Sequence, residues 1–319
     1  MEQTRREEAT ALLPHASTAG DVLAALADGG NAREVTSDGH SVFHLLRFDS
    51  EEVARTLLTL GGADPNAHAP CSCASVLQTC IARGLLRTVH VLLEHGARPD
   101  LGALTAVLGL ERPLKWLLRD LLARVEPEHD AEYAQPLLER AVGDDATWAV
   151  EVLLARFGPP VRLESTVLSP DTATALLDGG MDPDAPVGNL HLAHIFCSSP
   201  EYLAELQRRG ADMTTASDKA GITALHITAS AAAARFLVEQ AGVPVDIPTR
   251  RDGKTPMLTA VRAGRYAVAQ ELLRLGADPH VANRRGQSAV SCLQEQVARA
   301  GSAPARALLL TIDATPMEL

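Results

Sequence analysis

Residues 252–279 read DGKTPMLTAVRAGRYAVAQELLRLGADP and decide the fold, because they contain the signals for two short helices and their flanking turns. Asp252 and Gly253 predict a tight turn, in which glycine tolerates a positive φ. Thr255 can then cap the first helix, and Pro256 suits its first turn, where the missing amide hydrogen breaks no helical bond. We therefore expect a short helix directly after this turn.

A second helix follows in the same stretch and ends at a glycine. The first helix is expected to end near Gly264, and the second carries the Leu272-Leu273 pair on its buried face. Gly276 stands where helices commonly leave through a left-handed conformation. Asp278 precedes a proline and therefore disfavours further helix. The stretch thus predicts a helix-turn-helix unit that ends abruptly.

The same pattern recurs along the chain with a period of about 33 residues. Residues 38–66 repeat the turn glycine, a histidine in the first helix, a Leu-Leu pair and a closing Gly-Ala-Asp, and residues 221–237 repeat its first part. Most of the helix-ending glycines lie 30 to 34 residues apart, or about twice that; they are Gly30, Gly62, Gly96, Gly158, Gly180, Gly210, Gly242 and Gly276. One structural unit is therefore repeated through most of the chain.

These residues resemble the ankyrin repeat, whose core reads Gly-x-Thr-Pro-Leu-His-x-Ala, followed by Leu-Leu and Gly-Ala-Asp. The resemblance covers roughly residues 17–312 and implies an all-α solenoid of about nine to ten helix-turn-helix units. Residues 1–16 are then expected to form an N-terminal extension and residues 313–319 a C-terminal tail. The units at about 101–187 are expected to be irregular.

The irregular units depart from the pattern in definite ways. The turn motif is missing between Leu101 and Pro160, and the acidic stretch 126–132 predicts a longer connection. The unit at 163–180 is shortened, with Pro170 opening its second helix. We expect these units to be the weakest part of the stack, because they lose the turn glycine and the capping residue.

Composition narrows the class of protein. The chain has 319 residues with 46% hydrophobic and 3% aromatic residues, and it has no apolar run long enough for a transmembrane helix. The net charge of −11 disfavours binding to nucleic acid or to a membrane surface. Five cysteines are too few for a disulfide framework at this length. We expect a cytoplasmic protein, with a nuclear or a delivered-effector location left open.

Three short matches to chemical motifs have structural explanations. Gly253-Lys254-Thr255 resembles the end of a phosphate-binding loop, but Pro248 stands where that loop needs glycine. His191 and His194 have metal-ligand spacing, yet His191 is assigned to the structural histidine position of His44 and His226. A zinc site could use four residues, His68, Cys71, Cys73 and Cys80, although Cys80 is expected in a buried helix. We expect no metal and no cofactor.

One surface pattern predicts a binding site. Residues 249–290 hold eight basic residues against three acidic ones, so this segment carries +5 and the remainder of the chain −16. Arg250-Arg251 and Arg284-Arg285 are 34 residues apart, which places them at neighbouring turn tips. The predicted partner-binding residues are Arg250, Arg251, Lys254, Arg262, Arg284 and Arg285. Such a basic rim suits an acidic or phosphorylated segment.

The resemblance implies a non-enzymatic interaction module or adaptor, which binds a partner protein in a concave groove of turn tips and inner helices. We expect a monomer that binds another protein through an acidic segment. The alternative is an enzyme or a small-molecule binder with its site in the irregular middle units, where His194, Glu164, Asp171 or Asp184 would converge. A deep apolar pocket there would favour the alternative, and a shallow groove would favour the adaptor.

Overall fold

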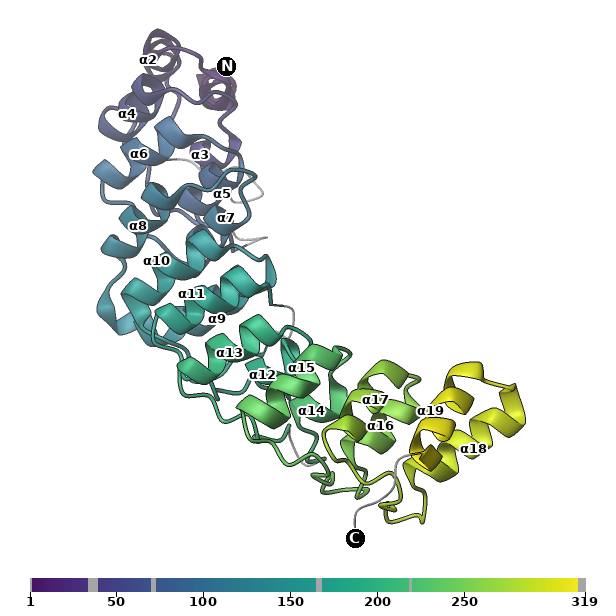
Figure 1. Ribbon diagram of the computed structural model, residues 1–319. Helices are drawn as coiled ribbons and strands as arrows, with labels where there is room; N and C mark the ends of the chain where they lie inside the picture. The colour runs from purple at the N-terminus through teal and green to yellow at the C-terminus, as the bar shows by residue number, and fades with distance from the viewer. Residues whose placement is uncertain (1, 34–39, 70–72, 165–167, 218–219, 315–319) are drawn as a thin grey trace. The chain divides into compact units, whose positions relative to one another are not determined.

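The computed structural model describes residues 2–33, 40–69, 73–164, 168–217 and 220–314, and every regular element in them is a helix (Figure 1). Extended pairing in these residues is limited to isolated bridges. The all-α expectation is confirmed. The chain forms two compact units, Met1–Gly158 and Pro159–Leu319.

The first unit is built from helix pairs in two layers. α3, α5, α7 and α9 pack on one another in that order, while in the other layer α2 packs on α4, α4 on α6, and α8 on α10 (Figure 1). Its helices are α1 (Glu2–Leu12), η1 (Leu13–His15), α2 (Ala19–Ala27), α3 (Val42–Leu45), α4 (Glu51–Thr59), α5 (Val76–Ala82), α6 (Leu86–Glu94), α7 (Leu101–Leu108), α8 (Lys115–Arg124), η2 (Pro127–His129), α9 (Asp130–Gly143) and α10 (Thr147–Phe157).

The second unit repeats this arrangement. α12, α14, α16 and α18 pack in sequence in one layer, and α13, α15, α17 and α19 do so in the other. α11 is the single helix described between residues 163 and 180. The helices of the second unit are α11 (Pro170–Asp178), α12 (Leu192–Ile195), α13 (Pro200–Arg208), α14 (Ala224–Ile227), α15 (Ala231–Arg235), the π-helical η3 (Phe236–Gln240), α16 (Pro256–Arg262), α17 (Tyr266–Arg274), α18 (Ala289–Ala300) and α19 (Ala303–Ala314).

The stretch that predicts the repeat folds as expected. α16 begins at Pro256, and the Thr255 hydroxyl accepts a hydrogen bond of 3.2 Å from the Leu258 amide. Leu272 is fully buried on α17. Gly276 has a φ of +91°, so the chain leaves α17 through the left-handed region that glycine favours. Side-chain capping and leucine burial therefore explain this unit locally.

One expectation for the irregular units is wrong. The acidic stretch 126–132 is not a longer connection: it forms the one-turn η2, and α9 already begins at Asp130, because acidic residues suit the first turn of a helix. The expected loss of capping holds for some helices only: α8, α9 and α10 have no side-chain cap, whereas Asp100 caps α7 through the Ala103 amide at 2.7 Å and Ser169 caps α11. The shortened unit at 163–180 is confirmed, with α11 opening at Pro170.

Within the described residues, no helix is long and apolar enough to cross a membrane.

Candidate functional site: the basic turn tips

The predicted site centres on two turns of the second unit, which we call the basic tips. The first tip spans residues 250–253 and is closed by two 2.9 Å bonds, one from the Thr249 amide to the Lys254 carbonyl and one from the Lys254 amide to the Thr249 hydroxyl. The second tip spans residues 284–286 and is closed by a 2.9 Å bond from the Asn283 amide to the Gln287 carbonyl. Hydrogen bonds at its base therefore hold each tip in a defined turn.

A buried side chain fixes the second tip further. The Asn283 side-chain oxygen accepts hydrogen bonds from the Arg285 amide at 2.9 Å and from the Gln287 amide at 3.0 Å. Asn283 is 6% exposed, and Thr249 at the base of the first tip is 7% exposed. Because buried polar atoms hold both turns, the backbone under the arginines is preorganised.

The two tips contact each other directly. The Arg284 amide donates a 3.0 Å hydrogen bond to the Asp252 carbonyl, and the Arg284 guanidinium donates one of 3.2 Å to the Arg251 carbonyl. The Arg251 amide likewise donates to the Ala220 carbonyl of the preceding turn at 3.3 Å. Successive turns are therefore joined in a ladder, which fixes the spacing between their arginines.

The arginines of the basic tips differ in how they are held. All four are exposed. The stems of Arg250 and Arg284 lie against glycines of the preceding turns, since a Cβ on Gly221 would come within 2.5 Å of the Arg250 Cγ and one on Gly253 within 3.3 Å of the Arg284 Cγ. The side chains of Arg251 and Arg285 make no hydrogen bond or ion pair to any residue that the structure describes.

The other two predicted residues adjoin the basic tips. Lys254 forms a 2.7 Å ion pair with Asp252, and Arg262 donates a 3.0 Å hydrogen bond to the side chain of Gln287. The Lys254 hydrogen bond lowers the pKa of Asp252 below its usual value, and the charges of Arg251 and Arg285 add to this effect. Asp252 is thus a carboxylate that nearby cations of this group already stabilise.

A seventh basic residue of the segment has a structural role that the sequence does not reveal. Arg265 is half-buried, and its guanidinium donates to the carbonyls of His226 at 3.2 Å, Thr228 at 2.6 Å and Ile227. These carbonyls lie at the end of the four-residue helix α14, where they have no helical partners. Burial lowers the pKa of Arg265. Its guanidinium binds backbone carbonyls of the fold and is not part of the exposed basic surface.

The expectation that His191 occupies the same repeat position as His44 and His226 is wrong by one helical turn. His44 and His226 each reach a carbonyl of the next unit through Nε2, at Ala74 and Lys254, with distances of 3.1 Å. The corresponding residue is His194, whose Nε2 lies 2.8 Å from the Ile222 carbonyl. His191 instead occupies the N-cap of α12, where α3 has Ser41 and α14 has Thr223.

This replacement leaves a buried nitrogen unsatisfied. The hydroxyl of Ser41 lies 2.9 Å from Nδ1 of His44, and the hydroxyl of Thr223 lies 2.9 Å from Nδ1 of His226. His191 turns its own Nδ1 to the Asp184 carbonyl at 2.8 Å, and Nδ1 of His194 has no hydrogen-bond partner in the described chain. A buried ring nitrogen without a hydrogen-bond partner destabilises the fold.

We expect His191→Thr to raise the free energy of unfolding by about 1 kcal/mol, because the threonine hydroxyl can form a hydrogen bond with Nδ1 of His194. Urea unfolding followed by circular dichroism measures the change. Thr223→Ala is the matched control, since it removes the same bond at α14 and should lower stability by about 1 to 2 kcal/mol. A destabilised His191→Thr protein would show that the bond from His191 to Asp184 matters more than the missing cap.

The structure brings together two of the four residues of the alternative site. His194 lies against the Ile222 carbonyl, and the Asp184 carboxylate accepts from the Asp212 amide at 3.0 Å. Glu164 forms a 3.2 Å ion pair with Arg162, and Asp171 is exposed in the first turn of α11. Asp184 and His194 lie on either side of His191, which hydrogen-bonds the Asp184 carbonyl and has its ring 5.6 Å from that of His194, and the described contacts join neither Glu164 nor Asp171 to that pair.

The zinc candidate also has structural explanations among its described members. Cys80 is fully buried in α5, as expected, and burial raises the pKa of its thiol to about 12, which disfavours the thiolate that zinc needs. His68 forms a 3.7 Å ion pair with Asp100, and Cys73 is exposed. Cys71 lies outside the described residues.

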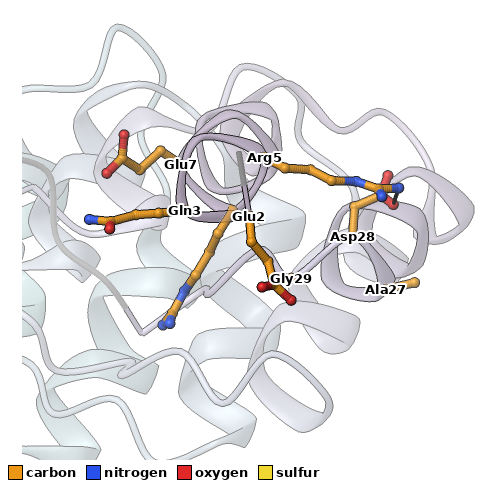
Figure 2. A pocket seen from close by; sticks show the side chains of 8 residues that line it. Glu2, Gln3, Arg5, Glu7, Ala27, Asp28 and Gly29 are labelled. Atoms are coloured by element: carbon orange, nitrogen blue, oxygen red, sulfur yellow. Dashed lines mark hydrogen bonds and ion pairs between the residues drawn. The ribbon is translucent and has the colours of Figure 1, made fainter.

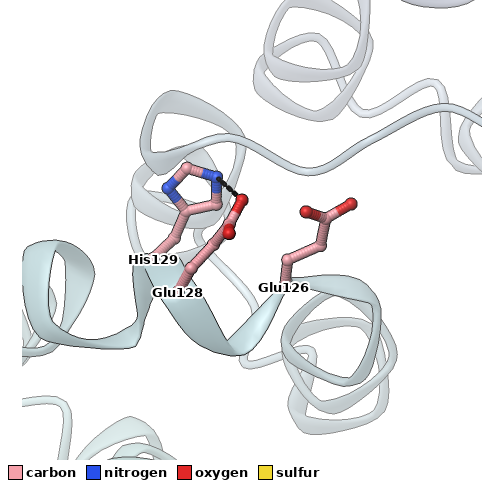
Figure 3. A group of neighbouring side chains, drawn as sticks. All are labelled: Glu126, Glu128 and His129. Carbon is pink, nitrogen blue, oxygen red and sulfur yellow. Dashed lines mark ion pairs between the residues drawn. The ribbon is translucent and has the colours of Figure 1, made fainter.

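Charged side chains also gather at two places outside the predicted site. Glu126, Glu128 and His129 meet on the turn η2, where the His129 imidazole lies 3.8 Å from the Glu128 carboxylate (Figure 3). Both carboxylates are exposed, so water can satisfy them without an ion. A polar hollow between α1 and α2 contains the 2.7 Å ion pair of Arg5 with Asp28 (Figure 2). Both places are lined mostly by polar or charged side chains.

Comparison with known proteins identifies the repeated unit. Residues 190–283 match the family model of ankyrin repeats in three copies. The ankyrin repeat domain of Bcl-3, described as a unique member of the IkappaB protein family, is similar at 20% identity, covering 73% of this chain and 97% of that chain with a TM-score of 0.39. The human ASB11 ankyrin repeat domain is similar at 17% identity, covering 95% of this chain and 96% of that chain with a TM-score of 0.26.

No curated protein matches the chain in sequence. Residues 190–283 contain ankyrin repeats, as the sequence predicts, and they include the whole first basic tip. Ankyrin repeats are in general protein–protein interaction modules.

Proposed function

We propose that this protein is a non-enzymatic interaction module or adaptor, whose repeat domain at 17–312 binds an acidic or phosphorylated segment of a partner protein at the basic tips. One observation carries the proposal: two hydrogen-bonded neighbouring turns each present a pair of exposed arginines on a fixed backbone. Arginine binds carboxylate and phosphate through two parallel hydrogen bonds. A preorganised backbone lowers the entropy lost when the partner binds.

The charge distribution supports a protein partner over a polyanion. Residues 249–290 carry +5 and the rest of the chain −16, so a long nucleic acid that left the basic tips would meet repulsion. A short acidic segment meets only the tips, and its association should slow as salt rises. We further propose that the protein acts as a monomer in the cytoplasm, where its cysteines stay reduced.

The test compares partner capture by the parent and by a variant with Arg250, Arg251, Arg284 and Arg285 all changed to Glu. We expect a partner recovered with the parent to be lost with this variant, because each glutamate repels an acidic segment. Affinity purification with quantitative mass spectrometry identifies the partner, and titration calorimetry with the purified partner then measures binding. Circular dichroism first establishes that both proteins are folded.

A matched control separates the site from the net charge. Arg98, Arg112, Arg119 and Arg306 are also exposed, and changing them to Glu alters the total charge equally. The partner should bind this control as tightly as the parent. Equal binding of the partner to the variant at the basic tips would remove these arginines from the interface.

A further inference from the structure

The ladder of turns sets a distance between the two basic tips. Each tip contributes two chain segments, and hydrogen-bonded segments lie about 5 Å apart, so equivalent points on successive tips lie about 10 Å apart. Helices packed side by side are separated by a similar distance of about 8 to 10 Å, which agrees with each repeat contributing one helix to each layer. The bonds from Arg251 to Ala220 and from Arg284 to Asp252 show that neighbouring turns are joined through their backbones.

This distance matches one conformation of an extended peptide. A polyproline II helix has three residues per turn and rises about 3.1 Å per residue, so residues i and i+3 face the same way about 9 Å apart. In a β-strand the same-facing residues i and i+2 are separated by about 6.6 Å, which is too short, and i and i+4 by about 13 Å, which is too long. The tips are therefore expected to favour acidic sequences whose acidic residues are three positions apart.

We propose that the basic tips bind an extended, polyproline II segment of the partner that has an acidic residue at every third position, so that successive carboxylates occupy successive tips. This inference rests on the proposed function and specifies its partner. On each tip one arginine stem is seated on a glycine, at Arg250 and Arg284, while the neighbouring guanidinium of Arg251 or Arg285 is free to close on the carboxylate. On each tip, one held arginine and one unrestrained arginine would therefore bind the same acidic side chain.

Asp252 acts as an internal competitor for these arginines. Its carboxylate is held by Lys254 at 2.7 Å and is stabilised by the charges of Arg251 on its own tip and Arg285 on the next. A partner carboxylate must share these cations with Asp252. Removing the internal charge should therefore strengthen binding, while asparagine keeps the size of the side chain.

The experiment measures binding of two labelled nonapeptides of equal composition by fluorescence anisotropy at low salt. One peptide is (Glu-Pro-Pro)₃, with glutamate at every third position; the other is Glu-Pro-Glu-Pro-Glu-Pro-Pro-Pro-Pro, with glutamate at every second position. We expect the first to bind the parent protein at least about fivefold more tightly, because only it can occupy both tips at once. Asp252→Asn should tighten its binding by about two- to threefold.

Two variants keep the test independent of folding. Arg251→Gln with Arg285→Gln removes the two side chains that make no described contact, and it should abolish the difference between the peptides. Arg112→Gln with Arg119→Gln removes two exposed arginines elsewhere and should preserve that difference.

The outcomes distinguish the two proposals. Equal binding of both peptides to the parent, weakened by the change of Arg250, Arg251, Arg284 and Arg285 to Glu, would refute the three-residue spacing and leave the acidic-segment site standing. If neither peptide binds the parent more tightly than that variant, both the spacing and the acidic-segment site are wrong.

Discussion

Leu272→Ala is expected to lower the free energy of unfolding by about 2 to 5 kcal/mol, because Leu272 is fully buried where α17 packs on its neighbours α15, α16 and α19. The substitution removes buried apolar surface and leaves a cavity that the short helices around it can only partly fill. In a stack held together by contacts between neighbours, this loss concentrates in the units next to α17.

Urea unfolding measures the total change, and hydrogen exchange locates it. We expect the amides of α16–α19 to exchange faster in the variant, while those of α2–α10 in the first unit keep their protection. Leu310→Ala is the matched control, since Leu310 on α19 is 63% exposed and its truncation should change stability by less than about 0.5 kcal/mol. An unchanged unfolding midpoint for Leu272→Ala would show that the assigned helical register is wrong.

Local signals predict most of the fold, and the reason is visible in one unit. Thr255, Pro256 and Gly276 each act within a few residues of their own position, through a cap, a fixed φ and a left-handed exit. The spacing of such signals is therefore enough to place α16 and α17. The same holds for Pro170, which opens α11.

The histidine assignment fails because its deciding contact is not local. Two histidines three residues apart both fit the motif, and His191 is the first that the pattern meets. The bond from His194 to Ile222, 28 residues away, distinguishes them, and only the packed structure reveals it. Arg265 escapes prediction for the same reason, since its carbonyl partners at the end of α14 lie up to 39 residues away.

The site is predictable in part on similar grounds. A spacing of 34 residues between the arginine pairs follows from the period, and it places them on neighbouring turns. The hydrogen bonds that join those turns, and the seating of Arg284 on Gly253, depend on how one unit packs on the next. The sequence therefore locates the charges, while the geometry that would select a partner comes from packing.

Acidification from pH 6.5 to pH 4 is expected to lower the stability of the protein, with about 3 kcal/mol of the loss due to His226 alone. His226 is 1% exposed, and burial lowers its pKa from 6.5 to about 4. Nε2 lies 3.1 Å from the Lys254 carbonyl and can donate to it, while Nδ1 accepts from the Thr223 amide at 3.1 Å. A proton on Nδ1 would therefore oppose an amide donor.

The sign follows from the proton balance. Between pH 6.5 and pH 4 the unfolded chain holds a proton on His226 that the native protein does not, so the free energy of unfolding falls as pH falls. Burial also lowers the pKa of His44 and His194, which adds to the same trend. Burial raises the pKa of the Asp184 and Asp246 carboxyls, and these two groups act in the opposite direction as they protonate at lower pH.

Urea unfolding at half-unit steps from pH 7.5 to pH 4 measures this dependence. His226→Gln should be less stable than the parent at pH 7, because it loses the bond to the next unit, but its stability should fall less steeply with acid because the titrating group is gone. His280→Gln, which changes an exposed histidine on the same unit, is the matched control and should keep the slope of the parent. The contacts between repeats are expected to be acid-sensitive because the buried histidines in them stay neutral. A parent protein equally stable at pH 6.5 and pH 4.5 would therefore contradict the assignment of neutral, buried histidines to these contacts.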